Sequence, residues 1–208
     1  MKKIWDKIFR KIKTNKRMMV FLFTLLFMAI LFGSFYAIQL NEADLNEVKT
    51  SLDTFFQTVK EGKLESIPAF FQSFLANFFF VIVLFLLGIS VIGIPFMLIL
   101  FFMKAFTLGF TITVMMKLYK GKGILYSIAY VFPHQISNIL IFTFFMMFAL
   151  SLSAMLVLAL FKKKTVDFSK IMNRYLLMFG TSLLLLVGTS LLETFLMPNI
   201  FRYLLSSL

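Results

Sequence analysis

Residues 74–116 read FLANFFFVIVLFLLGISVIGIPFMLILFFMKAFTLGFTITVMM, and this stretch decides the fold. It consists of two apolar arms, each close to the roughly 20 residues that cross a bilayer as a helix. Between the arms, Gly88 and Gly93 relax the backbone, and Pro95 prevents one helix from running straight through. The stretch therefore predicts a helical hairpin with a hinge at these three residues.

The composition of the whole chain is that of a membrane protein. Hydrophobic residues make up 61% of its 208 residues and charged residues only 14%, against about 45–50% and about 25% in a soluble domain. The net charge of +12 comes from bases that lie in blocks beside apolar segments, which indicates membrane topology and contact with anionic lipid, not nucleic-acid binding. We expect an all-α, polytopic helical bundle.

Five membrane spans follow from the hydropathy of the sequence. We place them at about 18–40, 70–87, 94–116, 135–161 and 175–197. Eight bases precede the first span and five lie in 162–174, against seven on the opposite side. The positive-inside rule then puts the N-terminus in the cytoplasm and the C-terminus outside the cell. Residues 18–208 form one membrane domain in the cell membrane.

Residues 1–17 form a separate cytoplasmic segment that is basic and amphipathic. Ile4, Ile8 and Ile12 recur every four residues, while lysine and arginine occupy the remaining face. Such a helix lies along the lipid surface. It serves either as a topology signal alone or as a helix that binds a partner.

Residues 41–68 differ in character from the spans and carry six acids against three lysines. We expect an extracytoplasmic amphipathic helix that turns back towards the membrane at residues 60–63. Its apolar stripe comprises Leu45, Val48, Leu52, Phe55 and Val59. The stripe either packs on the outer rim of the protein itself or docks an extracytoplasmic partner.

Residues 117–123 form a basic, turn-rich loop on the outer side, and the 38 residues that follow it, 124–161, are too many for one ordinary span. We expect Pro133 to divide them, because proline interrupts a helix. The division leaves a short interfacial or half-buried helix over 124–132 before the crossing helix.

Polar residues inside a span are costly and therefore indicate a structural or functional role. Five of them fall at similar depth in the outer third of the membrane: Asn77, His134, Gln135, Asn138 and Glu193. We expect a hydrogen-bonded cluster, with His134 facing Glu193. The cluster either only specifies helix packing or forms a working site for a proton, an ion or a partner.

Lys104 is the one basic residue inside a predicted span. An unpaired charge near the bilayer centre costs about 2.5–3.5 kcal/mol on insertion scales. The side chain reaches towards the cytoplasmic surface along its helix, which lowers this cost, or serves helix packing, or makes a specific ion pair.

Little in the sequence indicates catalysis or a cofactor. The chain has no cysteine and one histidine, so a disulfide, a thiol nucleophile or a metal site is not expected. No phosphate-binding glycine loop and no paired acids of a hydrolase occur. The many phenylalanines and methionines suit lipid-facing and packing positions.

Three stretches together resemble a known family. LLGISVIGIPFMLILFFMKAFTLGF (86–110), SIAYVFPHQISNI (127–139) and ETFLMP (193–198) resemble the stage II sporulation protein M family of bacterial membrane proteins. The matching positions are Gly88, Gly93, Pro95, Lys104, Gly109, Pro133 and Gln135. Distant members carry a glutamate shortly after the Pro-His pair, where this chain has Asn138.

The resemblance implies a non-enzymatic membrane scaffold of engulfment during sporulation. Such a protein anchors the peptidoglycan-degrading stage II sporulation proteins D and P, which carry out the chemistry. The rival reading is the membrane subunit of a transporter or permease, with an outward-facing polar site built from the intramembrane polar residues. A scaffold predicts a packed bundle with extracytoplasmic partners, and a transporter predicts solute flux through a water-accessible cavity.

Overall fold

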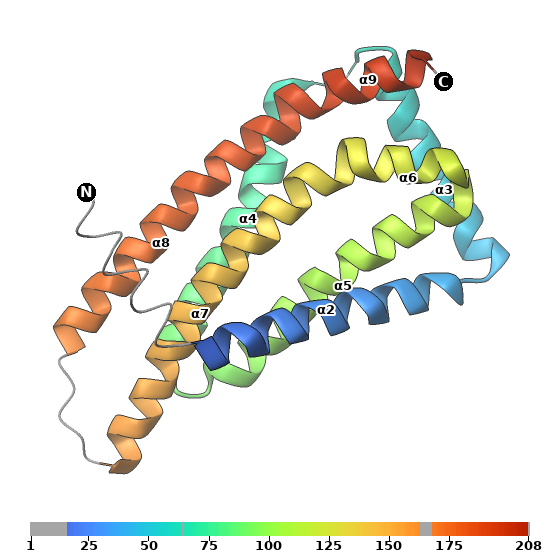
Figure 1. Cartoon of the computed structure of the whole chain (residues 1–208). Coiled ribbons are helices and arrows are strands. Elements are labelled where there is room, and N and C mark those ends of the chain that lie inside the picture. Colours follow the sequence, from blue (N-terminus) through green and yellow to red (C-terminus); the bar gives the residue numbers. More distant parts are fainter. Residues whose placement is uncertain (1–15, 64, 163–167, 208) are drawn as a thin grey trace.

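The computed structural model describes residues 16–63, 65–162 and 168–207, and all regular structure in these ranges is helical. Figure 1 shows the long helices side by side as a bundle, with the shorter ones gathered at one end. The elements are α2 (Lys16–Ile38), α3 (Glu42–Lys60), α4 (Ser66–Ile89), α5 (Gly93–Tyr119), α6 (Gly121–Tyr126), η1 (Ser127–Val131), α7 (Phe132–Lys162), α8 (Phe168–Leu191), η2 (Leu192–Leu196) and α9 (Met197–Ser207).

Five helical stretches in the described chain are long and apolar enough to cross a membrane, which confirms the predicted helical membrane bundle. They are Lys16–Ile38, Ser66–Ile89, Gly93–Tyr119, Pro133–Leu160 and Ser169–Tyr203. Most of the predicted amphipathic segment 1–17 lies outside the described residues, as does part of the basic loop 162–174.

The hairpin of α4 and α5 turns tightly at residues 90–92, and its glycines serve close packing. A Cβ on Gly88 would lie 2.2 Å from Oη of Tyr175, and one on Gly93 would lie 1.8 Å from the carbonyl oxygen of Leu87. Among the described glycines only Gly62 has a positive φ. Close packing, and not a need for unusual backbone angles, therefore explains why glycine occupies positions 88 and 93. Pro95 lies in the first turn of α5, where its missing N–H breaks no helical hydrogen bond.

Helices α2 and α5 approach each other closely through small residues. A Cβ on Gly33 would lie 2.1 Å from the carbonyl oxygen of Phe106, and one on Gly109 would lie 2.1 Å from that of Ile30. Ala29 and Ala37, one turn on either side of Gly33, are fully buried. Small residues spaced by four allow helix backbones to touch in a membrane, where van der Waals packing drives association.

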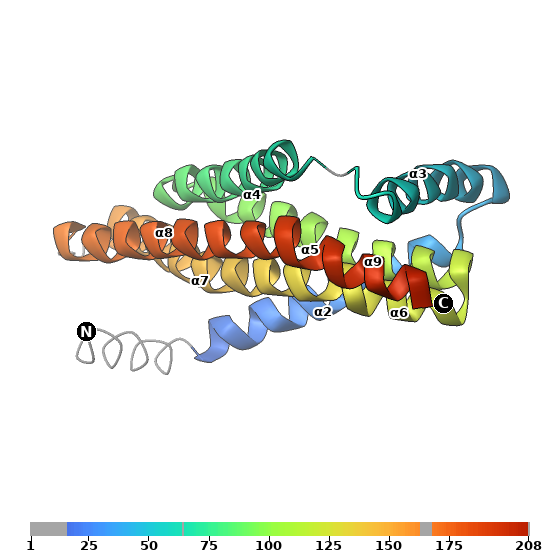
Figure 2. The same cartoon turned by 90° about the horizontal axis from the view of Figure 1, so that it is seen from above.

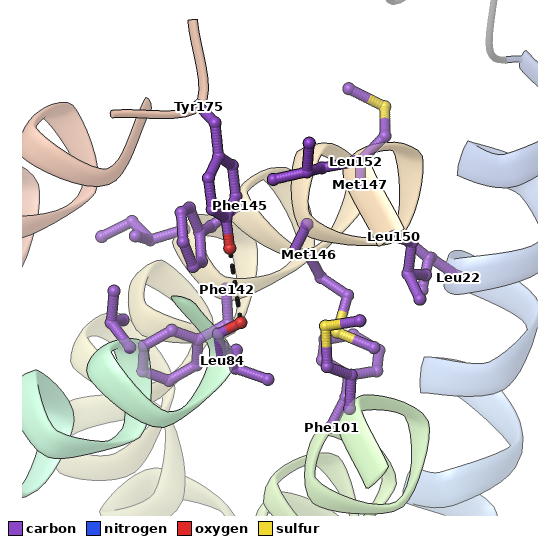
Figure 3. Close-up of a cluster of buried hydrophobic side chains, with 14 of the residues drawn as sticks. Leu22, Leu84, Phe101, Phe142, Phe145, Met146, Met147, Leu150, Leu152 and Tyr175 are labelled. Atoms are coloured by element: carbon purple, nitrogen blue, oxygen red, sulfur yellow. Dashed lines mark hydrogen bonds between the residues drawn. The ribbon is translucent and has the colours of Figure 1, made fainter. Parts of the chain in front are cut away.

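The main apolar core lies near the α4–α5 turn and is centred on α7 (Figure 3). Tyr175 of α8 is almost fully buried there, and its ring stacks on Phe85 and Phe145 with centroids 5.0 and 5.5 Å away. Its hydroxyl donates a hydrogen bond to the carbonyl oxygen of Phe85 at 3.0 Å. The buried polar group thus has an acceptor, and the core is closed around it.

The membrane-spanning stretch begins at Pro133, close to the predicted start at about 135, but the helix does not break there. Instead α6, η1 and α7 follow one another without a gap, and the five residues before Phe132 form a π-helical turn. The same arrangement recurs where η2 ends two residues before Pro198. A π turn re-pairs the backbone where proline lacks an N–H, so the helix bends but continues.

Helix α3 packs on the end of the bundle that α6 and α9 form (Figure 2). Phe56 is its main anchor, with ring centroids 5.3 Å from Tyr119, 5.3 Å from Tyr126 and 5.1 Å from Phe201. Asp53 accepts a hydrogen bond from the Tyr119 hydroxyl at 2.6 Å. These contacts hold α3 in one orientation.

The predicted basic loop 117–123 is instead a sharp corner between two helices. Helix α5 continues to Tyr119, and only Lys120, with a φ of 53°, separates it from α6. Nζ of Lys117 donates hydrogen bonds to the carbonyl oxygens of Ile38 and Leu40 at 2.9 and 3.0 Å. This lysine therefore caps the C-terminal end of α2.

Candidate functional site

A polar cavity of about 200 Å³ lies inside the bundle, and all five predicted cluster residues line it. Its wall is built from helices α4, α5 and α7 and the π turn η2. The lining residues are Ser73, Ala76, Asn77, Lys104, Thr107, His134, Gln135, Asn138, Ile139 and Glu193. The structure thus brings together residues up to 120 positions apart in the sequence.

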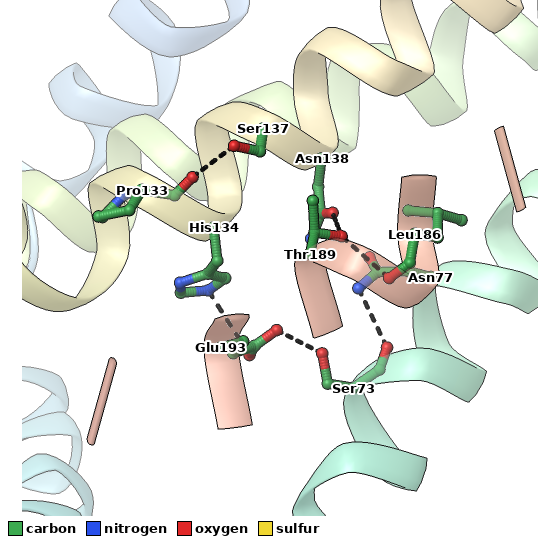
Figure 4. Close-up of polar contacts among 9 residues, drawn as sticks. All are labelled: Ser73, Asn77, Pro133, His134, Ser137, Asn138, Leu186, Thr189 and Glu193. Carbon is green, nitrogen blue, oxygen red and sulfur yellow. Dashed lines mark hydrogen bonds and ion pairs between the residues drawn. The ribbon is translucent and has the colours of Figure 1, made fainter. Parts of the chain in front are cut away.

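Glu193 joins two walls of the cavity (Figure 4). One carboxylate oxygen accepts a hydrogen bond from the hydroxyl of Ser73 on α4. The other lies 3.6 Å from Nε2 of His134 on α7, as the sequence analysis expected of this pair. Glu193 lies within η2, and Pro133 and His134 directly follow the first residue after η1. Both partners are therefore placed by π-helical turns, which are frequent at functional sites.

Amide side chains extend this polar layer further into the bundle. Oδ1 of Asn138 accepts a hydrogen bond from Thr189 on α8 at 2.6 Å, and Nδ2 of Asn77 donates to the carbonyl oxygen of Ser73 at 3.0 Å. Asn77, His134 and Asn138 are only 4–6% exposed. Buried polar groups with such partners stabilise one helix arrangement over others.

Lys104 also points into the cavity, which the sequence analysis did not predict. Its Nζ lies over the rings of Phe80 and Phe142, 5.5 Å and 5.7 Å from their respective centroids. Cation–π contacts of this kind favour a partly desolvated ammonium. Glu193 interacts with it electrostatically, but the two groups make no ion pair in contact. Lys104 thus brings a positive charge into the same space as the Glu193–His134 pair.

The cavity has a floor and a lateral mouth. Phe80 and Phe142 pack with ring centroids 4.6 Å apart below the Lys104 ammonium, one helical turn beyond the lining residues Asn77 and Asn138. Of the lining residues, Ala76 of α4 and Thr107 of α5 are exposed. Phe79 and Met103 are exposed on the same two helices, so the cavity opens at Ala76 and Thr107 towards the outer, lipid-facing surface of the bundle.

Ser73 and Thr189 complete the site but were not among the predicted residues. A spacing of four connects Ser73 with Asn77, and Thr189 with Glu193. Residues four apart share a face of a helix. This spacing is a signal in the sequence that would have identified both hydroxyl groups.

The five residues of the predicted docking stripe lie on α3, away from the cavity. Val59 is buried, Leu52 and Phe55 pack on the second apolar cluster, and Leu45 and Val48 are half-buried. Much of the stripe therefore packs against the protein itself, and the outward surface of α3 is polar. The hinge residues Gly88, Gly93 and Pro95 do not line the cavity either.

The chemistry available in the cavity is charge pairing and hydrogen bonding. Within the described part of the chain, no three histidine, aspartate or glutamate side chains come close enough to hold a metal ion. One ammonium, one carboxylate, an imidazole and several amides and hydroxyls remain. Such groups recognise a polar or charged ligand, or fix the packing of the helices that carry them.

Five spans enclosing an intramembrane polar layer define the chain as a multi-pass helical membrane protein. A family model described as Stage II sporulation protein M matches residues 20–198, and the chain belongs to that family. This confirms the resemblance noted in the sequence and makes the chain a sporulation membrane protein. Neither the curated proteins nor the solved structures contain a match to the chain.

Proposed function

We propose that this chain is a non-enzymatic membrane scaffold that assembles and localises peptidoglycan-degrading proteins during engulfment. Its membership of the Stage II sporulation protein M family supports a role in the sporulating cell membrane. On this proposal the partners are the stage II sporulation proteins D and P, which cut peptidoglycan outside the membrane. The chain supplies their location and their binding sites.

The observation that carries the proposal is the fixed attachment of α3 to one end of the bundle. Phe56 is 7% exposed among three aromatic rings, and Asp53 is bonded to Tyr119. The opposite face of α3 is exposed and polar, and includes Glu47, Thr50 and Thr54. A surface that is already ordered loses little entropy when a partner binds. We place this end on the extracytoplasmic side.

The test is affinity capture of the tagged full-length chain from membranes of its native host during sporulation. The variant carries Glu47→Lys and Thr54→Lys on the exposed face of α3. The control carries Asn173→Lys, an exposed position near the start of α8. We expect wild type and control to retain peptidoglycan hydrolases and the α3 variant to lose most of them. Absence of hydrolases from the wild-type sample would contradict the proposal.

A second candidate function is transport, which the polar cavity favours. Lys104, His134 and Glu193 resemble a site for a charged solute. Phe80 and Phe142 pack on each other one helical turn beyond Asn77 and Asn138, so a solute that moves on towards the α4–α5 turn would have to displace both rings. Solute flux in vesicles that is abolished by Glu193→Gln, with an ATPase or a solute-binding protein in place of hydrolases, would favour this alternative over the scaffold.

A further inference from the structure

The ammonium group of Lys104 is the least satisfied charge in the cavity. Among the described residues, none accepts a hydrogen bond from its Nζ, whose contacts are the two ring faces of Phe80 and Phe142. The Gln135 amide likewise makes no hydrogen bond within the described chain. Charged groups inside membranes almost always pair. Hydrogen-bond donors thus remain available at the cavity wall.

The acid already present does not fill this need. One oxygen of Glu193 accepts the hydrogen bond from Ser73, the other lies 3.6 Å from Nε2 of His134, and neither is in ion-pair contact with Lys104. The Lys104 ammonium and the Gln135 amide therefore lack a hydrogen-bond acceptor. A carboxylate is the acceptor that pairs most strongly with an ammonium. A volume of about 200 Å³ exceeds the roughly 30 Å³ share of one water molecule several times and accommodates such a group.

The direction of access identifies where the carboxylate comes from. Ala76 and Thr107 are exposed at the mouth, on surfaces of α4 and α5 that also carry the exposed Phe79 and Met103. Lys104 lies eleven residues into α5, about 16 Å from its start at 1.5 Å per residue. A group that enters sideways at this depth is most readily carried by another membrane-spanning helix.

We infer that the cavity receives the aspartate or glutamate side chain of a membrane-spanning helix from a different protein, with Lys104 as its binding residue. A second copy of this chain does not supply it, because Glu193 is the only acid in the five described spans and lies inside its own bundle, bonded to Ser73. The inference rests on the proposed scaffold function, since it names the place where a scaffold holds a partner's membrane anchor.

The test uses the full chain in lipid vesicles and a synthetic Leu/Ala transmembrane helix with Asp at its centre. The chain has no cysteine, so Lys49→Cys on exposed α3 accepts one fluorophore for energy transfer from the labelled peptide. We expect the Asp peptide to bind about tenfold more tightly than the same peptide with Leu at its centre. Lys104→Met should reduce this preference to less than about twofold.

A second pair of variants keeps Lys104 and changes only the mouth. Ala76→Trp narrows it, and we expect the Asp preference to disappear. Val83→Trp lies two turns along the same exposed face of α4 and should leave the preference unchanged. Equal binding of the Asp and Leu peptides by wild type, or an unchanged preference in Lys104→Met, overturns the inference and leaves water as the partner of Lys104. Hydrolase capture is a separate measurement, so either proposal can fail alone.

Discussion

Tyr175 and Lys104 both place a polar group inside an apolar bundle, but their surroundings differ. The Tyr175 hydroxyl has a backbone acceptor, and its ring is stacked between two phenylalanines. The Lys104 ammonium lies over two rings but faces a cavity. The first arrangement stabilises the fold by itself. The second leaves an ammonium group available to bind a ligand. An interaction site needs such a group, whereas the stability of the fold does not.

The largest loss of stability is expected from creating a cavity in the apolar core around Tyr175. Tyr175→Ala removes a side chain that is 2% exposed, and we expect the free energy of unfolding in detergent to fall by about 3–5 kcal/mol. Tyr175→Phe keeps the stacking and loses only the hydrogen bond, at about 1 kcal/mol. Equal losses in the two variants would mean that the ring packing contributes nothing.

The contact between α2 and α5 should be nearly as sensitive. Gly109→Leu forces the helices apart, because even a Cβ would lie 2.1 Å from the carbonyl oxygen of Ile30, and overpacking costs about 1–3 kcal/mol. Gly180→Ala is the matched control, since no atom lies within 4 Å of a Cβ there. Gly109→Leu should unfold at a clearly lower temperature than Gly180→Ala. A stable Gly109→Leu protein would contradict the close approach.

Within the polar layer, Glu193 should contribute to stability. Glu193→Ala leaves Ser73 and His134 without their carboxylate, and an unsatisfied buried group costs about 1–3 kcal/mol. Glu193→Gln retains an acceptor for Ser73 and should cost less. The order of the two losses in thermal unfolding checks this assignment, and the reverse order would refute it.

Lys104 should contribute least to the stability of the isolated chain. Lys104→Met keeps most of the side-chain volume and removes a cation that lacks a hydrogen-bond acceptor in the described chain. We expect the free energy of unfolding to stay the same or to rise by up to about 1 kcal/mol, since burying an incompletely paired charge is unfavourable. A loss of about 2 kcal/mol or more would make Lys104 a structural residue.

The sequence predicts the five spans, the hairpin and the common depth of the five polar residues, because each depends on residue type and on position along a helix. The five cluster residues share one layer, and a helix with a fixed rise places them there. The direction in which the Lys104 side chain points cannot be predicted in this way. Helix α5 is apolar around its circumference, so no periodicity shows which side faces the bundle.

Two further differences arise from tertiary contacts. The apolar stripe of α3 follows from its periodicity, but what covers it does not: Tyr119, Tyr126 and Phe201 come from distant segments. Pro133 marks a bend and not a break, because a π turn restores the backbone pairing around it. The sequence rule that proline interrupts a helix does not predict a π turn that lets the helix continue.

The most direct measurement compares wild type, Lys104→Met and the exposed α8 control Asn173→Lys by affinity capture from sporulating cells, with thermal unfolding of each purified chain. We expect Lys104→Met to be at least as stable as the other two proteins and to be the only one that loses its peptidoglycan-hydrolase partners. Full retention of those partners by a stable Lys104→Met protein would contradict it.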